Sequence, residues 1–319
     1  MSVPSDSDAL LDSSRQLPSD DKGKTTNDSA VRRQHLRRGL LRIAREVSEL
    51  PVIRLLSAPL YRHYFRKPGS NLYFGVYDTY QEALNEAHRI SSAGLPSTYD
   101  VEAVTTIYLD QLQSLRTCDY PTLFWINRIL SEGGRKVFDL GGHLGLAYYG
   151  YQHYISFPAG LVWCVHDLPH VVAAGRRLAA ERDKLGALQF CETPHEADGF
   201  DILISTGALQ YLGYSLPSLI GELAHPPHHV LFNLTPLHPK KAFFTLQNLE
   251  IAVCPYRVES IERLVADMQA LGYRVRDHWD LRERRMRIPF KVEYEVDSYY
   301  GYYFERVVPE VESEVSPFL

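Results

Sequence analysis

Short apolar runs alternate with stretches of helical periodicity from Lys136 almost to the C-terminus, and this alternation limits the fold more than any other feature. The strand-like runs are KVFDL, LVWCVHDL, LQFCE, FDILIST, HVLFNL, YRVRDHW and SYYGYYFERV. Strands that are apolar throughout and are joined by helices are typical of a parallel sheet covered on both faces. The last two runs follow one another without a long helix between them, so we expect an antiparallel hairpin at one edge. The sequence therefore predicts an α/β fold with a mostly parallel seven-stranded sheet.

The expected helices of this region fall among and just after the first five runs. They are LAYYGYQHYI, HVVAAGRRLAAERDKL, a segment near SLPSLIGELA, and VESIERLVADMQALG. We expect the sheet domain to cover residues 131–310, with residues 311–319 as a C-terminal tail. Residues 1–30 are rich in Ser, Asp, Lys and Thr, which predicts a disordered tail. Residues 31–130 are expected to form a helical N-terminal region that caps a site in the sheet domain.

Three helical segments are expected in this N-terminal region. One follows a short aromatic segment with Phe74, Val76 and Tyr77, and Asp78 with Gln81 is a capping-box-like start for it. The apolar positions of VRRQHLRRGLLRIAREVSEL share one helical stripe, which Pro51 ends. Tyr108 to Ser131 reads as one or two further helices, broken at Pro121. The stretch up to Lys67 is strongly basic, so its helix either docks on its own domain with a solvated basic face or lies on an anionic membrane surface or a partner.

Composition argues against several classes of protein. A formal net charge of -5 gives no reason to expect a nucleic-acid partner, and no apolar run approaches the roughly 20 residues that cross a bilayer. No secretory signal is visible, and four cysteines without a CxxC pair predict neither a structural zinc site nor a disulfide framework. No metal is expected at the HPPHH loop either. We therefore expect a cytoplasmic protein, for which a homodimer stays open.

The stretch VFDLGGHLGLAYYGY places glycines between the first strand and the helix that follows it. In a doubly wound sheet, ligands lie beyond the carboxyl ends of the strands, and the turn after the first strand must let them approach the backbone. Gly141, Gly142 and Gly145 permit this, because glycine has no Cβ and reaches positive φ. Neither the dinucleotide fingerprint GxGxxG nor the phosphate-binding GxxxxGK[ST] is present. The turn therefore predicts a nucleotide-type site of another kind.

Two acids narrow the choice of ligand. Asp139 precedes the glycines, where a carboxylate would repel a pyrophosphate but attract a cation, directly or through water. S-adenosylmethionine carries both an ammonium and a sulfonium group. Asp167 ends the second strand roughly 20 residues beyond Gly145, the spacing of an acid that binds ribose hydroxyls. Asp167 could instead help to cap the helix that begins at LPHVV.

Asp139, Gly141 and Gly145 match the D-x-G-x-G-x-G turn, and the chain here resembles class I S-adenosylmethionine-dependent methyltransferases. His143 stands where the middle glycine usually lies, and Gly142 is an additional glycine. More narrowly, YFGVYDTYQEA, VHDLPHVVAAGR, STGALQYL and LFNLTPLHP resemble a family of bacterial methyltransferases encoded among surface-polysaccharide and natural-product genes. The resemblance implies a Rossmann-like fold, S-adenosylmethionine as cofactor and a small-molecule substrate. Some members look like cyclases that convert S-adenosylmethionine to azetidine-2-carboxylate and release methylthioadenosine.

The ends of the first four predicted strands supply the candidate site residues. For cofactor binding we expect Asp139, Gly141, Gly142, Gly145, Asp167, Leu168, Glu192, Thr193, Ser205 and Thr206. For catalysis we expect the side chains near the reacting end of the cofactor, which are His143, Tyr149, Gln210 and Tyr211. Several of these residues can also be explained without a role in binding or catalysis. Glu192 could be a solvated acid in a loop, each tyrosine could serve packing, and Gln210 with Tyr211 could start a helix.

Three functions compete for these residues. In methyl transfer, the protein positions a small acceptor against the methyl group, and His143, Tyr149 or Tyr211 is the base if the acceptor is a hydroxyl. In cyclisation, the amine of S-adenosylmethionine attacks its own γ-carbon inside a tyrosine-rich pocket that attracts the sulfonium by cation–π interaction. A non-catalytic protein that binds S-adenosylmethionine is the third. We expect methyl transfer first.

Overall fold

The computed structural model describes residues 51–67, 72–91, 112, 115–249 and 252–307. The chain divides into two compact units at Ser57, and all elements after helix α2 (Pro51–Phe65) belong to the second unit. The predicted N-terminal tail and the predicted helix before Pro51 lie outside the described residues. Pro51 is the first residue of α2. None of the helices in the described part of the chain has both the length and the apolar character needed to cross a bilayer.

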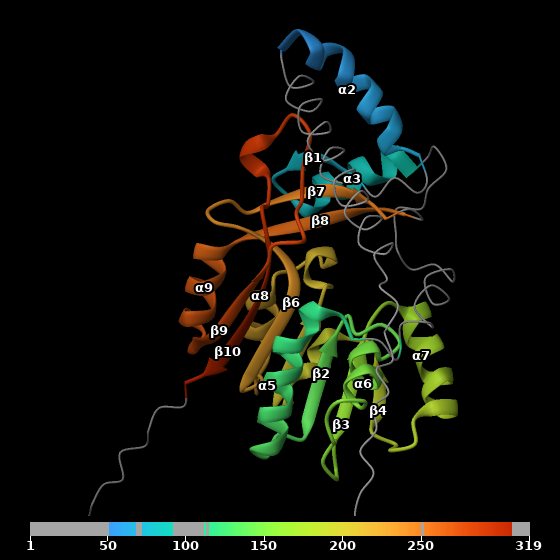
Figure 1. Ribbon diagram of the computed structural model, residues 1–319, viewed down its shortest axis with the longest axis vertical. Helices are drawn as coiled ribbons and strands as arrows, with labels where there is room; N and C mark the ends of the chain where they lie inside the picture. The colour runs from blue at the N-terminus through green and yellow to red at the C-terminus, as the bar shows by residue number, and fades with distance from the viewer. Residues whose placement is uncertain (1–50, 68–71, 92–111, 113–114, 250–251, 308–319) are drawn as a thin grey trace, which may run out of the picture. The chain divides into compact units, whose positions relative to one another are not determined.

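The predicted α/β sheet is confirmed. The described part of the chain forms one ten-stranded sheet, in which the seven predicted strands follow the order β4-β3-β2-β5-β6-β10-β9 (Figure 1). Their bounds are β2 (Lys136–Leu140), β3 (Val162–His166), β4 (Leu188–Cys191), β5 (Ile202–Thr206), β6 (His229–His238), β9 (Tyr273–Leu281) and β10 (Tyr299–Arg306). The first five run parallel, and β10 is antiparallel to both β6 and β9, as the predicted edge hairpin requires. This order places the switch point between β2 and β5.

Helices cover both faces of this sheet, because successive residues of each strand point to opposite sides. On β2, Val137 belongs to a core cluster with helices α5 and α6, whereas Phe138 belongs to a cluster with α8 and α9. The bounds are α5 (Tyr120–Ser131), α6 (Leu146–Tyr151), α7 (Pro169–Arg182), α8 (Leu216–Glu222) and α9 (Ile261–Ala270). Pro121 lies in the first turn of α5, so it starts this helix instead of breaking one.

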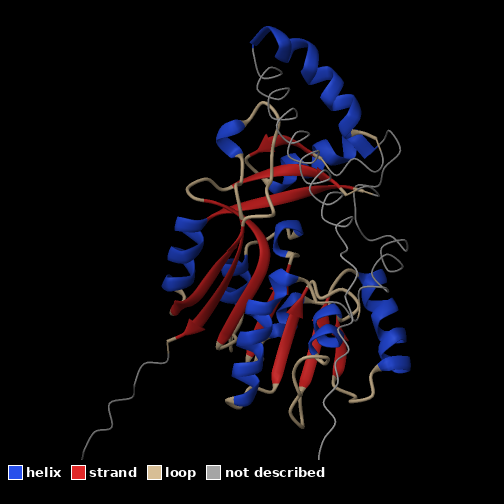
Figure 2. Cartoon of the chain, in the orientation of Figure 1, coloured by secondary structure: helices blue, strands red, loops and turns tan. Residues whose placement is uncertain are grey.

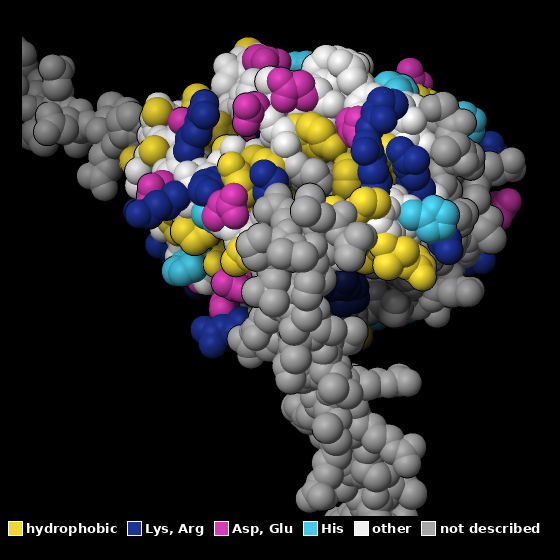
Figure 3. All heavy atoms as spheres, turned by 90° about the horizontal axis from the view of Figure 1, so that it is seen from above, with side chains coloured by type: hydrophobic (Ala, Val, Ile, Leu, Met, Phe, Trp, Pro, Cys, Tyr) yellow, Lys and Arg dark blue, Asp and Glu magenta, His cyan; other side chains and the backbone are white. Residues whose placement is uncertain are grey.

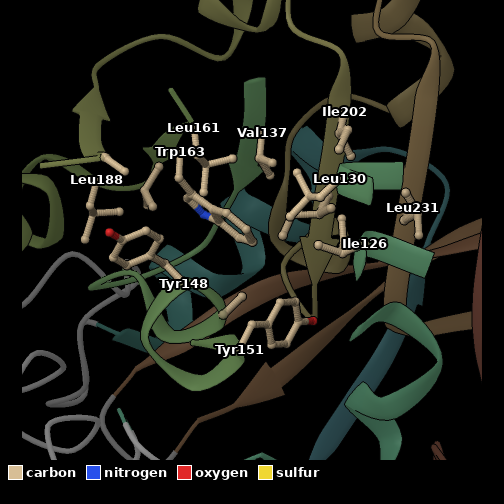
Figure 4. Close-up of a cluster of buried hydrophobic side chains, with 14 of the residues drawn as sticks. Ile126, Leu130, Val137, Tyr148, Tyr151, Leu161, Trp163, Leu188, Ile202 and Leu231 are labelled. Carbon is tan, nitrogen blue, oxygen red and sulfur yellow. The ribbon is translucent and has the colours of Figure 1, made fainter. Parts of the chain in front are cut away.

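The cluster on the α5 and α6 face fixes the position of the glycine turn. Trp163 of β3 is fully buried at its centre, and Tyr148 and Tyr151 of α6 pack against it at ring-centroid distances of 5.8 and 6.1 Å (Figure 4). Burying a large apolar side chain contributes about 1.5–3 kcal/mol. The short helix α6 is therefore held mainly by its aromatic side chains, and the turn that precedes it is held with it.

A second group of three strands was not predicted as such. The strands β1 (Tyr73–Tyr77), β7 (Phe243–Asn248) and β8 (Val253–Ser260) pair antiparallel, and the end of β6 pairs with β8 (Figure 2). The sequence suggested only a short aromatic segment for β1 and included the end of β8 in a helix. The helix α9 begins three residues later than predicted, because Ser260 caps it by accepting a hydrogen bond from the Arg263 N–H at 3.3 Å.

The described part of the basic N-terminal stretch packs on this second group of strands. Phe65 of α2 is fully buried in a cluster with α3 (Tyr80–Ser91) and with Phe244 and Leu246 of β7. The Arg62 guanidinium pairs with Glu86 of α3 at 3.3 Å. On the face shown in Figure 3, described Lys and Arg side chains lie among acidic and apolar ones. These contacts involve residues after Ser57 alone, and the predicted basic helix before Pro51, with its two alternatives, lies outside the described residues.

Candidate functional site

A cavity of about 950 Å³ lies at the carboxyl ends of the parallel strands, beside the switch point. One side, the sheet-end half, is lined by the loops after β2, β3, β4 and β5, which are residues 140–143, 166–169, 192 and 206–208. The other side, the tyrosine half, is lined by β1, α3, β7, β8, β10 and the β9–β10 loop. Its polar side chains are Tyr73, Tyr80, His88, Gln247, Tyr256, Arg284 and Tyr299. Tyr211, on the 3-10 helix η4 (Leu209–Tyr211), lies between the two halves.

The glycine turn has no room for side chains at two positions. Gly141 has a φ of +74°, and a Cβ there would overlap the Cβ of Ala208 in the loop after β5. A Cβ at Gly142 would overlap the carboxyl group of Asp139. The Gly141 N–H donates to the His166 carbonyl at 2.7 Å, which ties the turn to β3. The loops after β2 and β5 are therefore close at Gly141 and Ala208. The cavity reaches the main chain of Gly141 and Gly142.

Asp167 is held by the same turn. Its carboxylate accepts hydrogen bonds from the His143 N–H at 2.8 Å and from the Leu168 N–H at 2.7 Å. His143 has a φ of +56°, which turns its N–H toward Asp167. Leu168, not Asp167, occupies the N-cap position of α7, and its side chain is 36% exposed at the edge of the cavity. The turn and the acid after β3 thus form one unit, although 24 residues separate His143 from Asp167.

Asp139 lies behind the turn and does not line the cavity. It is fully buried on the α6 side of β2, where Trp163 Nε1 donates to its Oδ2 at 3.2 Å. Within the described part of the chain, its Oδ1 has no hydrogen-bond partner. Burial raises the pKa of this carboxyl to about 7, against the lowering effect of the Trp163 bond and with a further rise from Asp167. The Asp139 carboxyl group fills the space that a side chain at Gly142 would need.

The other predicted residues divide between the cavity and its surroundings. The cavity is lined by Gly141, Gly142, His143, Asp167, Leu168, Glu192, Thr206, Gln210 and Tyr211. Four more lie outside its lining with structural contacts: Ser205 Oγ donates to the Leu140 carbonyl at 2.8 Å, Thr193 and Glu196 form a capping box, Gly145 is the N-cap of α6 with a φ of +87°, and Tyr149 packs in the core. The predicted roles of all these residues remain predictions.

Among the buried polar side chains that line the cavity, Gln210 and Tyr151 each have an oxygen without a partner in the described part of the chain. The Gln210 side chain is 5% exposed; its Nε2 donates to the Gly207 carbonyl at 2.8 Å, but its Oε1 has no partner. Tyr151 is 1% exposed and lines the cavity, and its hydroxyl has no partner either. Buried polar groups in proteins are nearly always hydrogen-bonded, so these two atoms are candidates for ligand contacts. Tyr151 was not among the predicted site residues.

Arg116 is a further lining residue that the sequence did not single out. Its Nε and Nη2 donate to the two carboxylate oxygens of Asp119 at 2.9 and 3.0 Å. Asn233 of β6 also donates to Asp119, at 3.1 Å, and accepts from Trp279 Nε1 at 3.0 Å. Asp119 is therefore occupied by protein donors. Arg116 lines the cavity, and its Nη1 group has donors beyond the two bonds to Asp119.

The tyrosine half contains a chain of hydroxyl groups. The Tyr299 hydroxyl lies 3.0 Å from that of Tyr73 and 2.8 Å from that of Tyr256. The Tyr211 hydroxyl donates to Gln247 Oε1 at 2.8 Å, and the rings of Tyr73 and Tyr211 both pack edge-on to Tyr256 at 5.2 Å. Burial raises the pKa values of Tyr73, Tyr256 and Tyr299, so their hydroxyls stay protonated at neutral pH. Tyr73 and Tyr256 were missed because β1 and β8 were not predicted to meet at the site.

A histidine cluster lies elsewhere on the sheet. His228, His229 and Glu305 bring their ligand atoms within 4.8 Å of one another at the amino end of β6. Glu305 pairs with Arg274 at 2.6 Å, and His229 Nδ1 lies 2.8 Å from the Tyr303 hydroxyl. These protein contacts already occupy two of the three side chains.

No protein-family model matches the sequence, and no curated protein matches it. Solved structures resemble the fold. A Burkholderia thailandensis 1,6-didemethyltoxoflavin-N1-methyltransferase has 15% identity and a TM-score of 0.42 over 72% of this chain and 89% of that one. A glycopeptide N-methyltransferase has 14% identity and a TM-score of 0.37 over 61% and 100% of the chains, and a mitomycin 7-O-methyltransferase has 16% and 0.40 over 71% and 67%. Likenesses this distant carry no functional argument, so function depends on the residues of the cavity.

Proposed function

We propose that this chain is an S-adenosylmethionine-dependent methyltransferase that acts on a small molecule. The observation that carries the proposal is the unit formed by the glycine turn and Asp167 at the switch point of the sheet. In this unit the backbone is open to a ligand at Gly141 and Gly142, and a carboxylate is fixed beside it by the His143 N–H. A ribose with two adjacent hydroxyl donors is complementary to such a carboxylate.

Several residues that line the cavity have groups complementary to parts of S-adenosylmethionine. Each Asp167 oxygen accepts one backbone N–H, and a carboxylate oxygen can accept a second hydrogen bond, such as one from a ribose hydroxyl. Leu168 offers an exposed apolar surface for the adenine. The amino-acid arm carries a carboxylate and an ammonium. Arg116 Nη1 suits the carboxylate, and the unpartnered oxygens of Gln210 and Tyr151 suit the ammonium.

Bound S-adenosylmethionine supplies an activated methyl group on a sulfonium. The protein's part is to hold the acceptor in line with that group and to keep water away, and positioning of this kind is worth several kcal/mol. Burial lowers the pKa of His143 to about 4, so its ring is neutral at pH 7 and adds no positive charge beside a sulfonium. A neutral ring can also accept a hydrogen bond from an acceptor hydroxyl or amine.

The tyrosine half supports transfer to a second molecule over cyclisation of S-adenosylmethionine. Cyclisation needs no second substrate, and a pocket for it would need only to fold and enclose the amino-acid arm. The cavity instead extends past the glycine turn to β1, β7, β8 and β10, and its volume of about 950 Å³ is near the upper end for ligand pockets. A cavity of that size has room for an acceptor beside the cofactor.

Calorimetry with S-adenosylhomocysteine tests the proposed binding. We expect the protein to bind this product, and Asp167→Asn to weaken binding by about 10-fold or more, because one carboxylate that accepts ribose hydroxyls is lost. Glu181→Gln is the matched control, since Glu181 is an exposed acid on α7 and should leave binding unchanged. Absence of binding by the folded wild-type protein would refute the proposal.

Incubation with S-adenosylmethionine alone, followed by mass spectrometry, separates the reactions. We expect the cofactor to persist at the rate of the enzyme-free control, since the acceptor is missing. Enzyme-dependent methylthioadenosine with a four-membered cyclic amino acid would establish cyclisation in place of methyl transfer. If an acceptor screen of the binding-competent protein never yields S-adenosylhomocysteine, the non-catalytic alternative is favoured.

A further inference from the structure

We infer that the tyrosine half of the cavity selects a methyl acceptor that carries a single carboxylate, which Arg284 binds with help from the hydroxyl chain of Tyr73, Tyr299 and Tyr256. This inference rests on the proposed function and adds the chemical class of the acceptor. It depends on three features of the described residues: the arrangement of the hydroxyls, the charge of the lining, and the packing of the tyrosine rings.

The hydroxyl chain has one hydrogen to give to a ligand. Three phenol groups carry three hydroxyl hydrogens, and the contacts of 3.0 Å and 2.8 Å to Tyr299 use two of them. The third hydrogen lies in a further contact between the Tyr73 and Tyr256 side chains, so the hydroxyl chain donates it to a ligand oxygen by giving up that contact; all three residues line the cavity. Since the three phenols stay protonated at neutral pH, the chain can donate to an acceptor oxygen.

The charge of this half favours an anion. Among the described residues that line it, Arg284 is the one arginine or lysine, and no Asp or Glu is present. No ion pair joins Arg284 to any acid in the described part of the chain, whereas its neighbours Arg282 and Arg287 are paired with Asp280 and Asp297. Arg284 lines the same cavity as Tyr73 and Tyr299, and its charge lowers the pKa of both hydroxyls against the larger effect of burial.

One cation beside phenol donors matches a carboxylate better than other groups. A guanidinium binds a carboxylate through two parallel hydrogen bonds, and a single positive charge balances a single negative one. A phosphate monoester would bring nearly two negative charges to a lining with one cation. A neutral amide would leave the Arg284 charge unbalanced, so it should bind less well. The tyrosine rings packed edge-on at 5.2 Å provide the apolar wall for the rest of the acceptor.

The test uses full-length protein loaded with S-adenosylhomocysteine and titrated in a calorimeter with matched probes. The probes are benzoate with benzamide, hexanoate with hexanamide, and phenyl phosphate. We expect at least one carboxylate to bind about 10-fold or more tightly than its amide, and Arg284→Gln to abolish this preference. Arg285→Gln is the control, because Arg285 is an exposed neighbour that does not line the cavity. Tyr299→Phe, which removes the middle hydroxyl, should weaken carboxylate binding several-fold.

Binding of S-adenosylhomocysteine itself separates the inference from the proposed function. It should be equal in the wild type, Arg284→Gln and Tyr299→Phe, and that equality also shows that the variants are folded. If the wild type fails to bind S-adenosylhomocysteine, the proposed function is wrong. If it binds but prefers no carboxylate over its amide, prefers phenyl phosphate, or keeps its carboxylate preference in Arg284→Gln, the inference alone is overturned.

Discussion

Replacement of Gly141 by alanine tests whether the contact between the loops after β2 and β5 determines the shape of the glycine turn. Two separate penalties are expected at this position. The residue has a φ of +74°, where an L-amino acid costs about 1–2 kcal/mol relative to glycine. Its new Cβ would also overlap the Cβ of Ala208, which is fixed to the backbone and cannot rotate away. Overpacking of this kind costs about 1–3 kcal/mol, so the sum is about 2–5 kcal/mol.

Gly160 provides a control for the first penalty. Its φ is +75°, and no atom lies within 4 Å of the Cβ that an alanine would add. Gly160→Ala should therefore cost only the about 1–2 kcal/mol of backbone strain. The difference between the two variants in urea unfolding isolates the overlap with Ala208. The two variants should also differ in ligand binding. Gly141→Ala should weaken S-adenosylhomocysteine binding, and Gly160→Ala should leave it unchanged.

A double-mutant cycle with Ala208→Gly completes the test. If the overlap causes the second penalty, the cost of Gly141→Ala should fall by about 1–3 kcal/mol in the Ala208→Gly background. The cycle subtracts the cost of placing a glycine at residue 208. Equal costs for Gly141→Ala and Gly160→Ala, together with no coupling to Ala208, would refute the description of the turn as a backbone contact.

Three further predictions follow from the core and the cavity. Burial raises the pKa of Asp139 to about 7 from its ordinary 3.8, so the folded state binds an extra proton between these pH values. The free energy of unfolding should therefore fall by up to about 4 kcal/mol as pH rises from about 4 to about 7. Asp139→Asn should flatten this pH dependence in urea unfolding, and an unchanged profile would contradict the assignment. Ile126→Ala, at a fully buried position of α5, should lower the free energy of unfolding by about 2–5 kcal/mol, whereas Leu185→Ala at a 60% exposed position should change it by less than about 0.5 kcal/mol. Tyr151→Phe should leave the thermal midpoint unchanged or slightly raised, because its hydroxyl has no partner among the described residues, but it should weaken S-adenosylmethionine binding in calorimetry if that hydroxyl contacts the ligand.

The sequence predicted seven strands because the runs from β2 to β6 are largely apolar and alternate with helical stretches, while β9 and β10 follow one another without a long helix. It did not predict β7, whose six residues are all buried and include Thr245, Gln247 and Asn248. A strand with buried polar residues has neither the alternating pattern of a half-exposed strand nor the apolar run of a central one. Its polar groups are satisfied by distant partners, as when Asn248 donates to the Phe65 carbonyl at 2.6 Å.

The candidate site shows the same division between local and distant information. Asp167 could be placed from its spacing to the glycine turn, and it lies in the cavity. The inward orientation of Asp139 follows from strand alternation, which puts it on the same face as Val137, although its position before the glycines drew attention to its charge instead. Tyr73 and Tyr299 are 226 residues apart, and their contact depends on how β1 reaches the sheet. No local pattern in the sequence carries that pairing.

The return of β8 to the end of β6 has a consequence for how this protein could diversify. Leu237 pairs with Glu259 and His238 with Ser260, so the chain leaves β6, builds β7 and β8, and comes back one strand spacing from its departure before α9 begins. Residues 239–258 therefore form an excursion whose two ends are fixed beside each other. Substitutions, insertions or a wholesale exchange of that excursion could reshape one wall of the cavity while the ends of β2, β3 and β5 keep their geometry. The fold thus separates residues 239–258, which can change with the ligand of the tyrosine half, from the strand ends that hold the glycine turn and Asp167.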